Sequence, residues 1–291
     1  MTYLITGATG DIGSKVVEHL LRRGERPRVF VRDAEKARSR FDNRVDLFGG
    51  DLADPAALRA ALKGVDEFFP VNTGPQIPAR DEAAAKAAKA AGVRHLVKLS
   101  SLDVKQGLAI GAWHERGEAA VRASGIRFTF VQPTGFMSNL LAWAASIKAE
   151  GVVRASTGEG RRAFVHSDDI AAVAAEALTS REYEGESLPI TGPEALSFAE
   201  VTAKIGATIG KQLIFQPISD AEARRRYAAT GAPEAETEAT SRYGVQFAKA
   251  AWQPSLTRRS GFSGESQLRW SSGQWRMRRP SADGRMGNQS R

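Results

Sequence analysis

Short apolar runs alternate with amphipathic stretches along most of the chain. Such runs predict buried strands, and apolar residues at helical spacing between them predict crossover helices. The predicted strands are residues 3–6, 28–31, 67–71, 95–99, 128–131 and 188–191, with a further strand that ends at Gly50-Asp51-Leu52. This alternation predicts an α/β fold, a Rossmann-type doubly wound parallel sheet with helices on both faces.

Glycines and capping residues mark the predicted helix ends. A first helix follows the first strand and stops at Gly24, and Asp54-Pro55 opens another that ends before Gly64. The alanine-rich segment 80–91 is a strong helix former closed by Gly92. Further helices are predicted at 115–123, at 137–148, from Asp168 or Asp169 to 178, and from a capping box at Ser197 and Glu200 to 209.

A glycine-rich turn joins the first predicted strand to the first predicted helix. It reads Gly7-Ala8-Thr9-Gly10-Asp11-Ile12-Gly13, a GxxGxxG spacing. Such a turn lets the backbone approach a pyrophosphate, and the N–H groups that open the helix favour an anion. Glycines alone can also serve a tight turn. The position between strand and helix predicts dinucleotide binding by Gly7, Thr9, Gly10, Asp11 and Ile12.

The end of the second strand bears on the choice between NADPH and NADH. An arginine there pairs with a 2′-phosphate, whereas an acidic residue accepts hydrogen bonds from a 2′-hydroxyl. The order is Val31-Arg32-Asp33. Arg32 favours NADPH, Asp33 keeps NADH open, and Arg32 as a solvated strand-end charge is the alternative.

Polar residues also follow the other predicted strands. Ligands of open α/β sheets bind at the carboxyl ends of strands beside the switch point. We therefore expect contacts with the cofactor. Loop capping is the alternative for Asp51, and turn formation is an equally open interpretation of the residues after the fourth and fifth strands. The residues are Asp51 and Leu52 after the third strand, Asn72, Thr73 and Gly74 after the fourth, and Ser100 and Ser101 after the fifth.

The rhythm of the pattern changes after Pro133 and divides the chain. We expect an NAD(P)-binding core at 1–135, a mixed segment at 136–192 with a substrate-site helix and returning core elements, and a small substrate lobe at 193–254. Residues 255–291 are predicted to be a poorly ordered basic tail, or a stretch not native to the protein. The segment 256–291 contains neither Val nor Ile, so it cannot bury much surface.

Net charge says little about partners here. The chain of 291 residues has a formal charge of +8, but residues 256–291 contain eight Arg, no Lys and two acidic residues and so carry six of those units. A nucleic-acid site needs a basic patch on a folded element, and the rest of the sequence has no such concentration. We expect a small-molecule substrate, a monomer or homodimer, and no nucleic-acid partner.

Several classes of site are excluded or disfavoured. The chain has no cysteine, and its four histidines are scattered without ligand spacing, so no metal site is predicted. No apolar run reaches the length of a membrane span, and no signal peptide precedes Gly7. These features predict a cytoplasmic protein without a membrane partner.

Together the motifs resemble those of the NmrA-like branch of atypical short-chain dehydrogenases/reductases. The shared features are the glycine turn, Arg32, 50–52, the segment 97–101 and the segment 132–139, over roughly residues 1–215. The chain is similar to the NAD(P)H-dependent quinone, azo-dye and triphenylmethane-dye reductases of that branch. The resemblance implies a reductase; we add Lys98 and Pro133 to the expected cofactor site, although a strand lysine can also point to solvent.

The tyrosine and lysine pair of typical short-chain dehydrogenases is missing. None of the four tyrosines has a lysine four residues later. The helix on which that pair would lie carries Trp113-His114, with Glu118 four residues after the histidine. His114 is the candidate catalytic proton donor, or a histidine satisfied by a local hydrogen bond. Glu118 either orients His114 or is a solvated helix residue.

Apolar residues beside His114 suggest the acceptor site. Trp113, Phe136, Met137 and Trp143 are expected to wall a pocket for a flat aromatic substrate, or else to belong to the core. The predicted reaction is hydride transfer from NAD(P)H to a quinone, azo or similar conjugated electrophile. A non-catalytic NAD(P)-sensing regulator, or an isomerase, dehydratase or C=C reductase of specialised metabolism, remains an alternative.

Overall fold

The computed structural model describes residues 1–240, 267–271 and 274–278. The chain forms two compact units, Met1–Trp252 and Gln253–Arg291. Among the described residues of the second unit, β12 (Gln267–Ser271) pairs antiparallel with β13 (Gln274–Arg278). The rest of the predicted tail lies outside the described residues.

The first unit is built on a seven-stranded sheet in the order β3-β2-β1-β4-β5-β6-β9, with every pairing parallel. This confirms the predicted Rossmann-type fold. The strands are β1 (Tyr3–Thr6), β2 (Arg28–Val31), β3 (Asp46–Gly49), β4 (Glu67–Phe69), β5 (His95–Leu99), β6 (Arg127–Pro133) and β9 (Ser187–Ile190). Three of them, β1, β2 and β5, have the predicted bounds.

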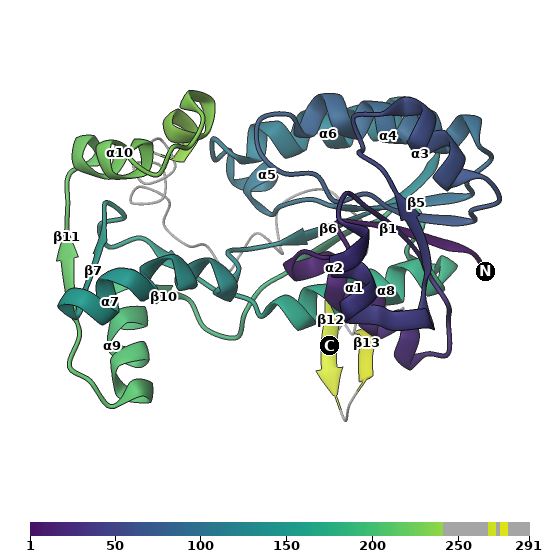
Figure 1. The fold of residues 1–291 in the computed structure, drawn as a ribbon. Helices are drawn as coiled ribbons and strands as arrows, with labels where there is room; N and C mark the ends of the chain where they lie inside the picture. Colours follow the sequence, from purple (N-terminus) through teal and green to yellow (C-terminus); the bar gives the residue numbers. More distant parts are fainter. Residues whose placement is uncertain (241–266, 272–273, 279–291) are drawn as a thin grey trace, which may run out of the picture. The chain divides into compact units, whose positions relative to one another are not determined.

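Helices cover both faces of the sheet (Figure 1). On one face lie α3 (Pro55–Leu62), α4 (Ile77–Ala90) and α6 (Gly111–Ala123). Small alanine side chains let α4 pack closely on Leu4, Phe68 and Leu96 of the strands beneath it.

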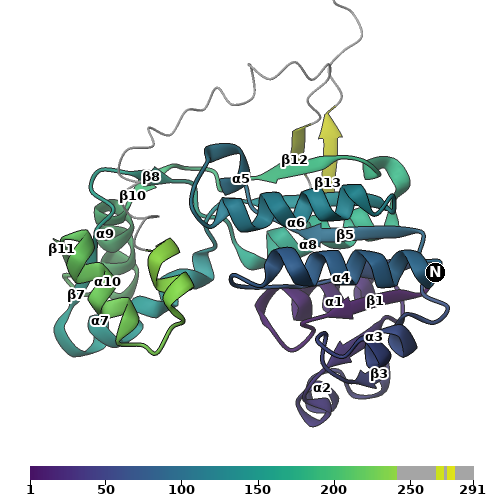
Figure 2. The same cartoon turned by 90° about the horizontal axis from the view of Figure 1, so that it is seen from above.

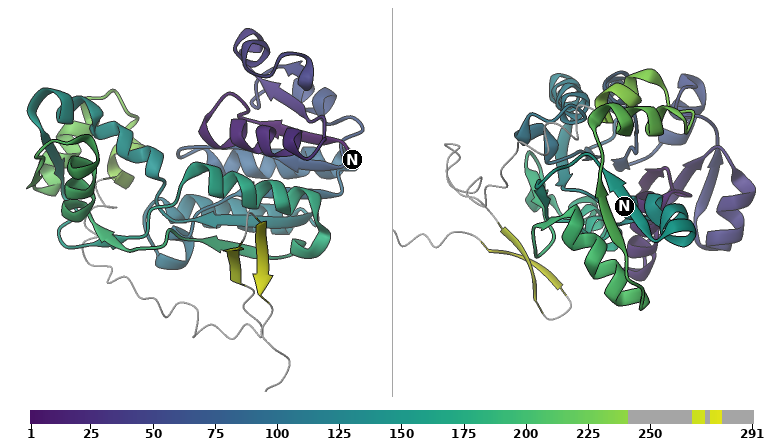
Figure 3. Two further views of the ribbon diagram at one scale, coloured as in Figure 1. Left: turned by 90° about the horizontal axis from the view of Figure 1, so that it is seen from below. Right: turned by 90° about the vertical axis from the view of Figure 1, so that its left-hand side faces the viewer.

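The other face carries α1 (Asp11–Arg22) and α8 (Ser167–Thr179), which lie side by side as the purple and green helices of Figure 3. Arg23 joins them through a 2.8 Å ion pair with Glu176. The cap of α8 differs from the prediction. His166 is its N-cap and accepts from the N–H of Asp168, so Asp168 and Asp169 lie inside the first turn.

Several short elements were not predicted. They are α2 (Ala34–Phe41), α5 (Asp103–Gln106) and the 3-10 turns η1 (Asp42–Arg44) and η3 (Arg181–Tyr183). Residues 137–148, predicted as one helix, form a 3-10 segment, η2 (Met137–Trp143), followed by α7 (Ala144–Glu150). Apolar periodicity does not distinguish a 3-10 segment from the start of an α-helix.

A small lobe is formed by segments that are distant in sequence. Within it, β7 (Val152–Ala155) pairs with β11 (Ile214–Pro217) and β8 (Arg161–Arg162) with β10 (Leu196–Ser197). Its helices are α9 (Phe198–Ile209), opened by the predicted capping box, and α10 (Asp220–Ala228). Figure 2 shows these elements together at one end of the sheet. The pairings join the mixed segment to the expected substrate lobe.

At Gly13, helix α1 passes close to the end of β1. A Cβ at this position would overlap the carbonyl oxygen of Gly7 and lie 2.9 Å from that of Thr6. We expect Gly13→Ala to lower the free energy of unfolding by about 3 kcal/mol and to weaken NADPH binding, because backbone and not a flexible side chain must move.

The matched control is Gly24→Ala at the other end of α1. Gly24 has a φ of +79° but open space around it, so only backbone strain of about 1–2 kcal/mol is expected. Urea titrations of both variants check the difference. Equal losses for the two would contradict the close-approach argument.

Candidate active site

The turn after β1 has the geometry of an anion site. Gly7 adopts a φ of +61°, which favours glycine, and the N–H of Gly10 donates to the carbonyl of Gly7 at 2.9 Å. Gly10 is the N-cap of α1 and supplies no side-chain acceptor. The N–H groups of the first turn are therefore left for a ligand, and the positive end of the helix dipole faces the same place. The residues fit the pyrophosphate of a dinucleotide.

The negative charge of the Asp11 side chain, next to this anion site, is offset by a hydrogen bond and an ion pair. Its carboxylate accepts from Ser167 Oγ at 2.6 Å and is paired with Lys15. Burial raises the pKa of Asp11, but hydrogen bonds from Lys15, Ser167 and Ser138 lower it, and the net shift is downward. Asp11 thus joins the glycine turn to the first turn of α8.

The predicted cofactor residues follow neighbouring strands and line one edge of the sheet. In strand order they run from Asp51 after β3, through Arg32 after β2 and Gly7 after β1, to Asn72 after β4 and Ser100 after β5. We call the end at Asp51 the adenine-side end and the end at Ser100 the nicotinamide-side end, after the orientation in which Rossmann-type folds bind dinucleotides. Pro133, the last residue of β6, extends this order by one strand.

At the adenine-side end, the side chains of Arg32, Asp33 and Asp51 differ in the contacts they make. Arg32 is exposed and has no hydrogen bond or ion pair with any residue that the structure describes. The carboxylate of Asp33 instead caps α2, accepting from the N–H of Lys36 at 3.0 Å. Asp51 accepts from the N–H of Ala53 at 2.8 Å, so its loop-capping interpretation is realised.

A sealed polar cluster lies beneath the nicotinamide-side end. Lys98 on β5 and Asp81 on α4 are each 1% exposed, and Lys98 Nζ lies 2.7 Å from Asp81 Oδ2. Asn72 Nδ2 donates to the other carboxylate oxygen at 2.8 Å. Gly117 on α6 leaves the space for this pair, since a Cβ there would collide with Asp81 Oδ2. Lys98 is therefore not a solvated strand lysine.

His114, near the start of α6, reaches the same cluster. Its Nδ1 lies 3.4 Å from Lys98 Nζ, and its side chain is only partly exposed. Burial, and then the charge of Lys98, lower the pKa of His114 to about 3. The imidazole is therefore neutral at physiological pH. It can donate an N–H hydrogen bond, but it does not hold the second proton that an imidazolium donor would give up.

The sequence interpretations of Glu118 were both wrong. Glu118 is 2% exposed, so it is not a solvated helix residue, and its carboxylate does not orient His114. It accepts from Ser100 Oγ at 2.5 Å and from Gln132 Nε2 at 2.8 Å. Because Ser100 follows β5 and Gln132 lies on β6, Glu118 fixes two strand ends against α6.

The predicted acceptor-site residues lie on the segment between β6 and the lobe and on α6. Trp143 packs edge-on against Phe198 with ring centroids 5.1 Å apart, so it contacts the lobe. Met137 is 39% exposed, and Phe136 and Trp113 are partly exposed. Apolar surface is thus available on η2 beside the nicotinamide-side strand ends.

Sequence reasoning missed two acidic residues near Asn72. A signal for Asp81 existed, because it shares the apolar face of α4 with Ile77, Ala84 and Ala88, where a charge needs a partner. The other is Glu236, in the helical segment 234–240. A Cβ on Gly74 would lie 2.5 Å from Glu236 Oε1, so this carboxylate covers the loop after β4. No sequence pattern indicated that contact.

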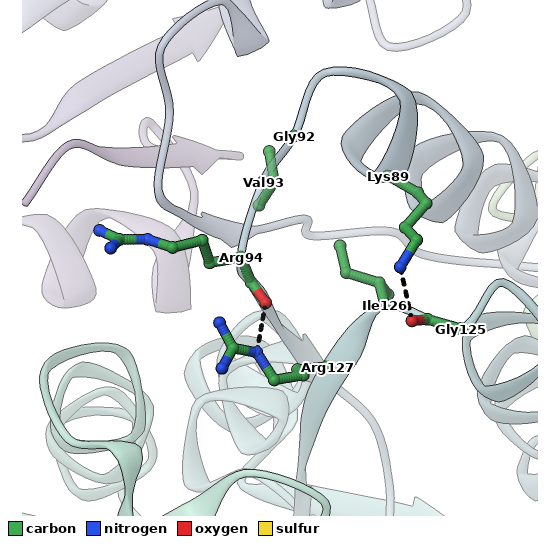
Figure 4. A pocket seen from close by; sticks show the side chains of 7 residues that line it. All are labelled: Lys89, Gly92, Val93, Arg94, Gly125, Ile126 and Arg127. Atoms are coloured by element: carbon green, nitrogen blue, oxygen red, sulfur yellow. Dashed lines mark hydrogen bonds between the residues drawn. The ribbon is translucent and has the colours of Figure 1, made fainter.

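A surface hollow of about 290 Å³ lies elsewhere, at the amino ends of β5 and β6 (Figure 4). Its three cations are engaged: Lys89 donates to the carbonyl of Gly125, Arg94 pairs with Asp66, and Arg127 donates to the carbonyl of Arg94. The cofactor edge is at the opposite ends of these strands.

Among the helices that the structure describes, none combines the length and the apolar character that a membrane span requires.

Comparison with known proteins agrees with this geometry. Residues 7–181, from the first glycine of the turn to just beyond α8, match a protein family described as NAD(P)H-binding. The chain belongs to this family. The resemblance to NmrA-like proteins inferred from the motifs is thereby confirmed.

Individual relatives are reductases. The chain is 39% identical to an NAD(P)H azoreductase of Xenophilus azovorans, over 81% of this chain and 84% of the relative. It is 40% identical to a (4-alkanoyl-5-oxo-2,5-dihydrofuran-3-yl)methyl phosphate reductase of Streptomyces griseus, over 89% of this chain and 87% of the relative. The NADPH complex of an Escherichia coli NADPH-dependent quinone oxidoreductase superposes with a TM-score of 0.77 at 27% identity. The superposition covers 86% of this chain and 89% of that protein.

The depressed pKa of His114 makes the stability of this family member depend on pH. The folded-state pKa of about 3 lies below the ordinary 6.5, so below pH 6.5 the unfolded chain binds a proton that the folded chain refuses. The contribution is complete above that pH and is lost as the pH falls from 6.5 toward 3. Over this window we expect a loss of up to about 1.4 kcal/mol per pH unit.

Urea unfolding of the unaltered chain and of His114→Gln, from neutral to mildly acidic pH, checks this expectation. The variant has no group that titrates at this position, so its free energy of unfolding should fall less steeply. Parallel pH curves for the two proteins would show that His114 is not shielded from protons.

Proposed function

We propose that the protein is an NADPH-dependent reductase that transfers hydride to a quinone, azo or similar conjugated electrophile. The observation that carries this proposal is the line of strand ends. It has an anion-binding glycine turn at its centre. On one side lies Arg32, which has no partner among the described residues, and on the other the buried Lys98/Asp81 pair, which His114 contacts. The azoreductase relative, at 39% identity, supports the azo class of acceptor.

Each residue has a role that its surroundings allow. The first turn of α1 holds the pyrophosphate, and Arg32 pairs with the 2′-phosphate. Bound NADPH supplies the hydride. His114, neutral and partly exposed, offers its N–H to the atom on which negative charge develops. Met137, Phe136 and Trp113 give apolar surface to a flat acceptor.

Such a site does not need a strong acid. Quinones and azo compounds are already electrophilic, so holding the acceptor against the hydride donor supplies much of the rate through proximity and orientation. A tyrosine activated by lysine, which the sequence lacks, serves alcohol oxidation. Its place on the helix after β5 is taken here by a neutral imidazole.

Arg32 is expected to determine the preference for NADPH. Arg32→Ala should raise the Kd for NADPH by about 10- to 100-fold, because charge-assisted hydrogen bonds to the 2′-phosphate are lost. The Kd for NADH should not change. Fluorescence titration of both cofactors measures the two values.

Arg38→Ala is the matched control, since it removes the same charge from the neighbouring helix, where Arg38 pairs with Glu35 at 2.7 Å. It should leave both affinities unchanged. A similar loss for NADPH and NADH in Arg32→Ala would show that Arg32 does not contact the 2′-phosphate.

Turnover is the direct test of the activity. NADPH oxidation is followed with a quinone, a neutral azo dye and a triarylmethyl dye cation as acceptors. We expect turnover of at least one of them and a slower reaction with NADH. Tight NADPH binding without turnover of any acceptor would refute the proposed activity and leave a cofactor-sensing role.

Reduction of a conjugated carbon–carbon double bond is the second candidate. It is favoured by the Streptomyces griseus relative, whose substrate is an unsaturated lactone phosphate. Glu236 at the loop after β4 disfavours a phosphate-bearing acceptor in this chain, since like charges repel. A butenolide with and without a phosphate, added to the same acceptor panel, separates the two candidates.

A further inference from the structure

The cluster beneath the nicotinamide-side strand ends contains a proton source that is sealed from water. Lys98 Nζ contacts Asp81 Oδ2 at 2.7 Å, the carbonyl of Leu99 at 3.2 Å and His114 Nδ1 at 3.4 Å. Lys98 and Asp81 are 1% exposed, whereas His114 is partly exposed. Of these neighbours, His114 alone connects the ammonium group with the open side of the site.

The chemistry of the pair fixes which nitrogen of His114 carries the proton. A lysine ammonium only donates, so Nδ1 must be the acceptor in this contact. In the neutral ring the proton therefore lies on Nε2. His114 thus has a donor on one side of its ring and, on the other, an acceptor that already faces a second donor.

We infer that Lys98 acts through His114 to supply the proton that a reduced acceptor takes up; this rests on the proposed reductase function. With an azo dye, hydride and its electron pair add to one nitrogen, the N=N double bond becomes a single bond, and the other nitrogen gains a negative charge. That nitrogen takes the proton from Nε2, while Nδ1 takes one from the Lys98 ammonium. NADPH is oxidised, the azo bond becomes a hydrazine, and Lys98 is left as a neutral amine.

Lys98 and Asp81 keep hydrogen-bond partners when the ammonium group gives up its proton. Asp81 stays hydrogen-bonded to Asn72 Nδ2 at 2.8 Å when the ammonium loses its proton. The carbonyl of Leu99 remains an acceptor for the amine N–H. After the product leaves, His114 is the route by which water restores the proton, because the side chains of Lys98 and Asp81 are closed to solvent.

The proton relay from Lys98 through His114 is tested by comparing an acceptor that needs a proton with one that does not. An azo dye needs hydride and a proton, whereas a triarylmethyl cation becomes a neutral product with hydride alone. Lys98→Arg keeps a positive charge but does not give up a proton, and His114→Gln keeps an N–H donor but cannot relay one. We expect each to lower kcat for the azo dye by about 10²- to 10⁴-fold, with the KM, the Kd for NADPH and kcat for the cation little changed.

The controls are Lys89→Arg and His19→Gln, on the far end of α4 and on α1, which should leave both reactions unchanged. If Lys98→Arg does not fold, His114→Gln carries the same comparison. Equal losses on both acceptors, or wild-type rates on the azo dye, would overturn the relay while the reductase function stands. Turnover of neither acceptor by the unaltered chain would overturn the relay, and a lack of turnover with the quinone as well would overturn the reductase function.

Discussion

The ion pair between Lys98 and Asp81 is the interaction on which the arrangement of the site depends. Removing two charges from water is costly, and their attraction offsets that cost only when further hydrogen bonds complete the geometry. Asn72 supplies one such bond, and Gly117 leaves the space in which α4 and α6 approach. The pair does more for the position of these elements, and for the electrostatics at His114, than for net stability.

The remaining polar contacts make the cofactor side of the site rigid. Asp11 is bonded to Ser167, which joins the glycine turn to the second half of the core. Glu118 holds Ser100 and the strand beside it. These side chains are hydrogen-bonded to one another, so the strand ends present a fixed surface to the cofactor.

The acceptor side has a different character. In the proposed function it is assigned to the 3-10 segment η2 and the lobe, where Met137 and Leu141 are 39% and 73% exposed. Apolar contact selects acceptors by shape and polarity and discriminates weakly between them. A rigid cofactor edge beside an open apolar surface is consistent with relatives that reduce azo compounds, a quinone and a lactone phosphate.

Local pattern by itself determined the Rossmann-type core, the glycine turn and the bounds of β1, β2 and β5, because strand burial, glycine backbone freedom and helix capping act between near neighbours in sequence. The position of Arg32 as a charge at the end of a strand could also be identified from the sequence. Tertiary structure alone decided the partners of Lys98, the burial of Glu118 and the approach of Glu236 to Gly74. The contacts of Lys98 and Glu236 join residues far apart in the chain, and the burial of Glu118 depends on Ser100 and Gln132 from neighbouring strands. Whether a charged side chain faces water or a buried partner is set by the packing of helices on the sheet.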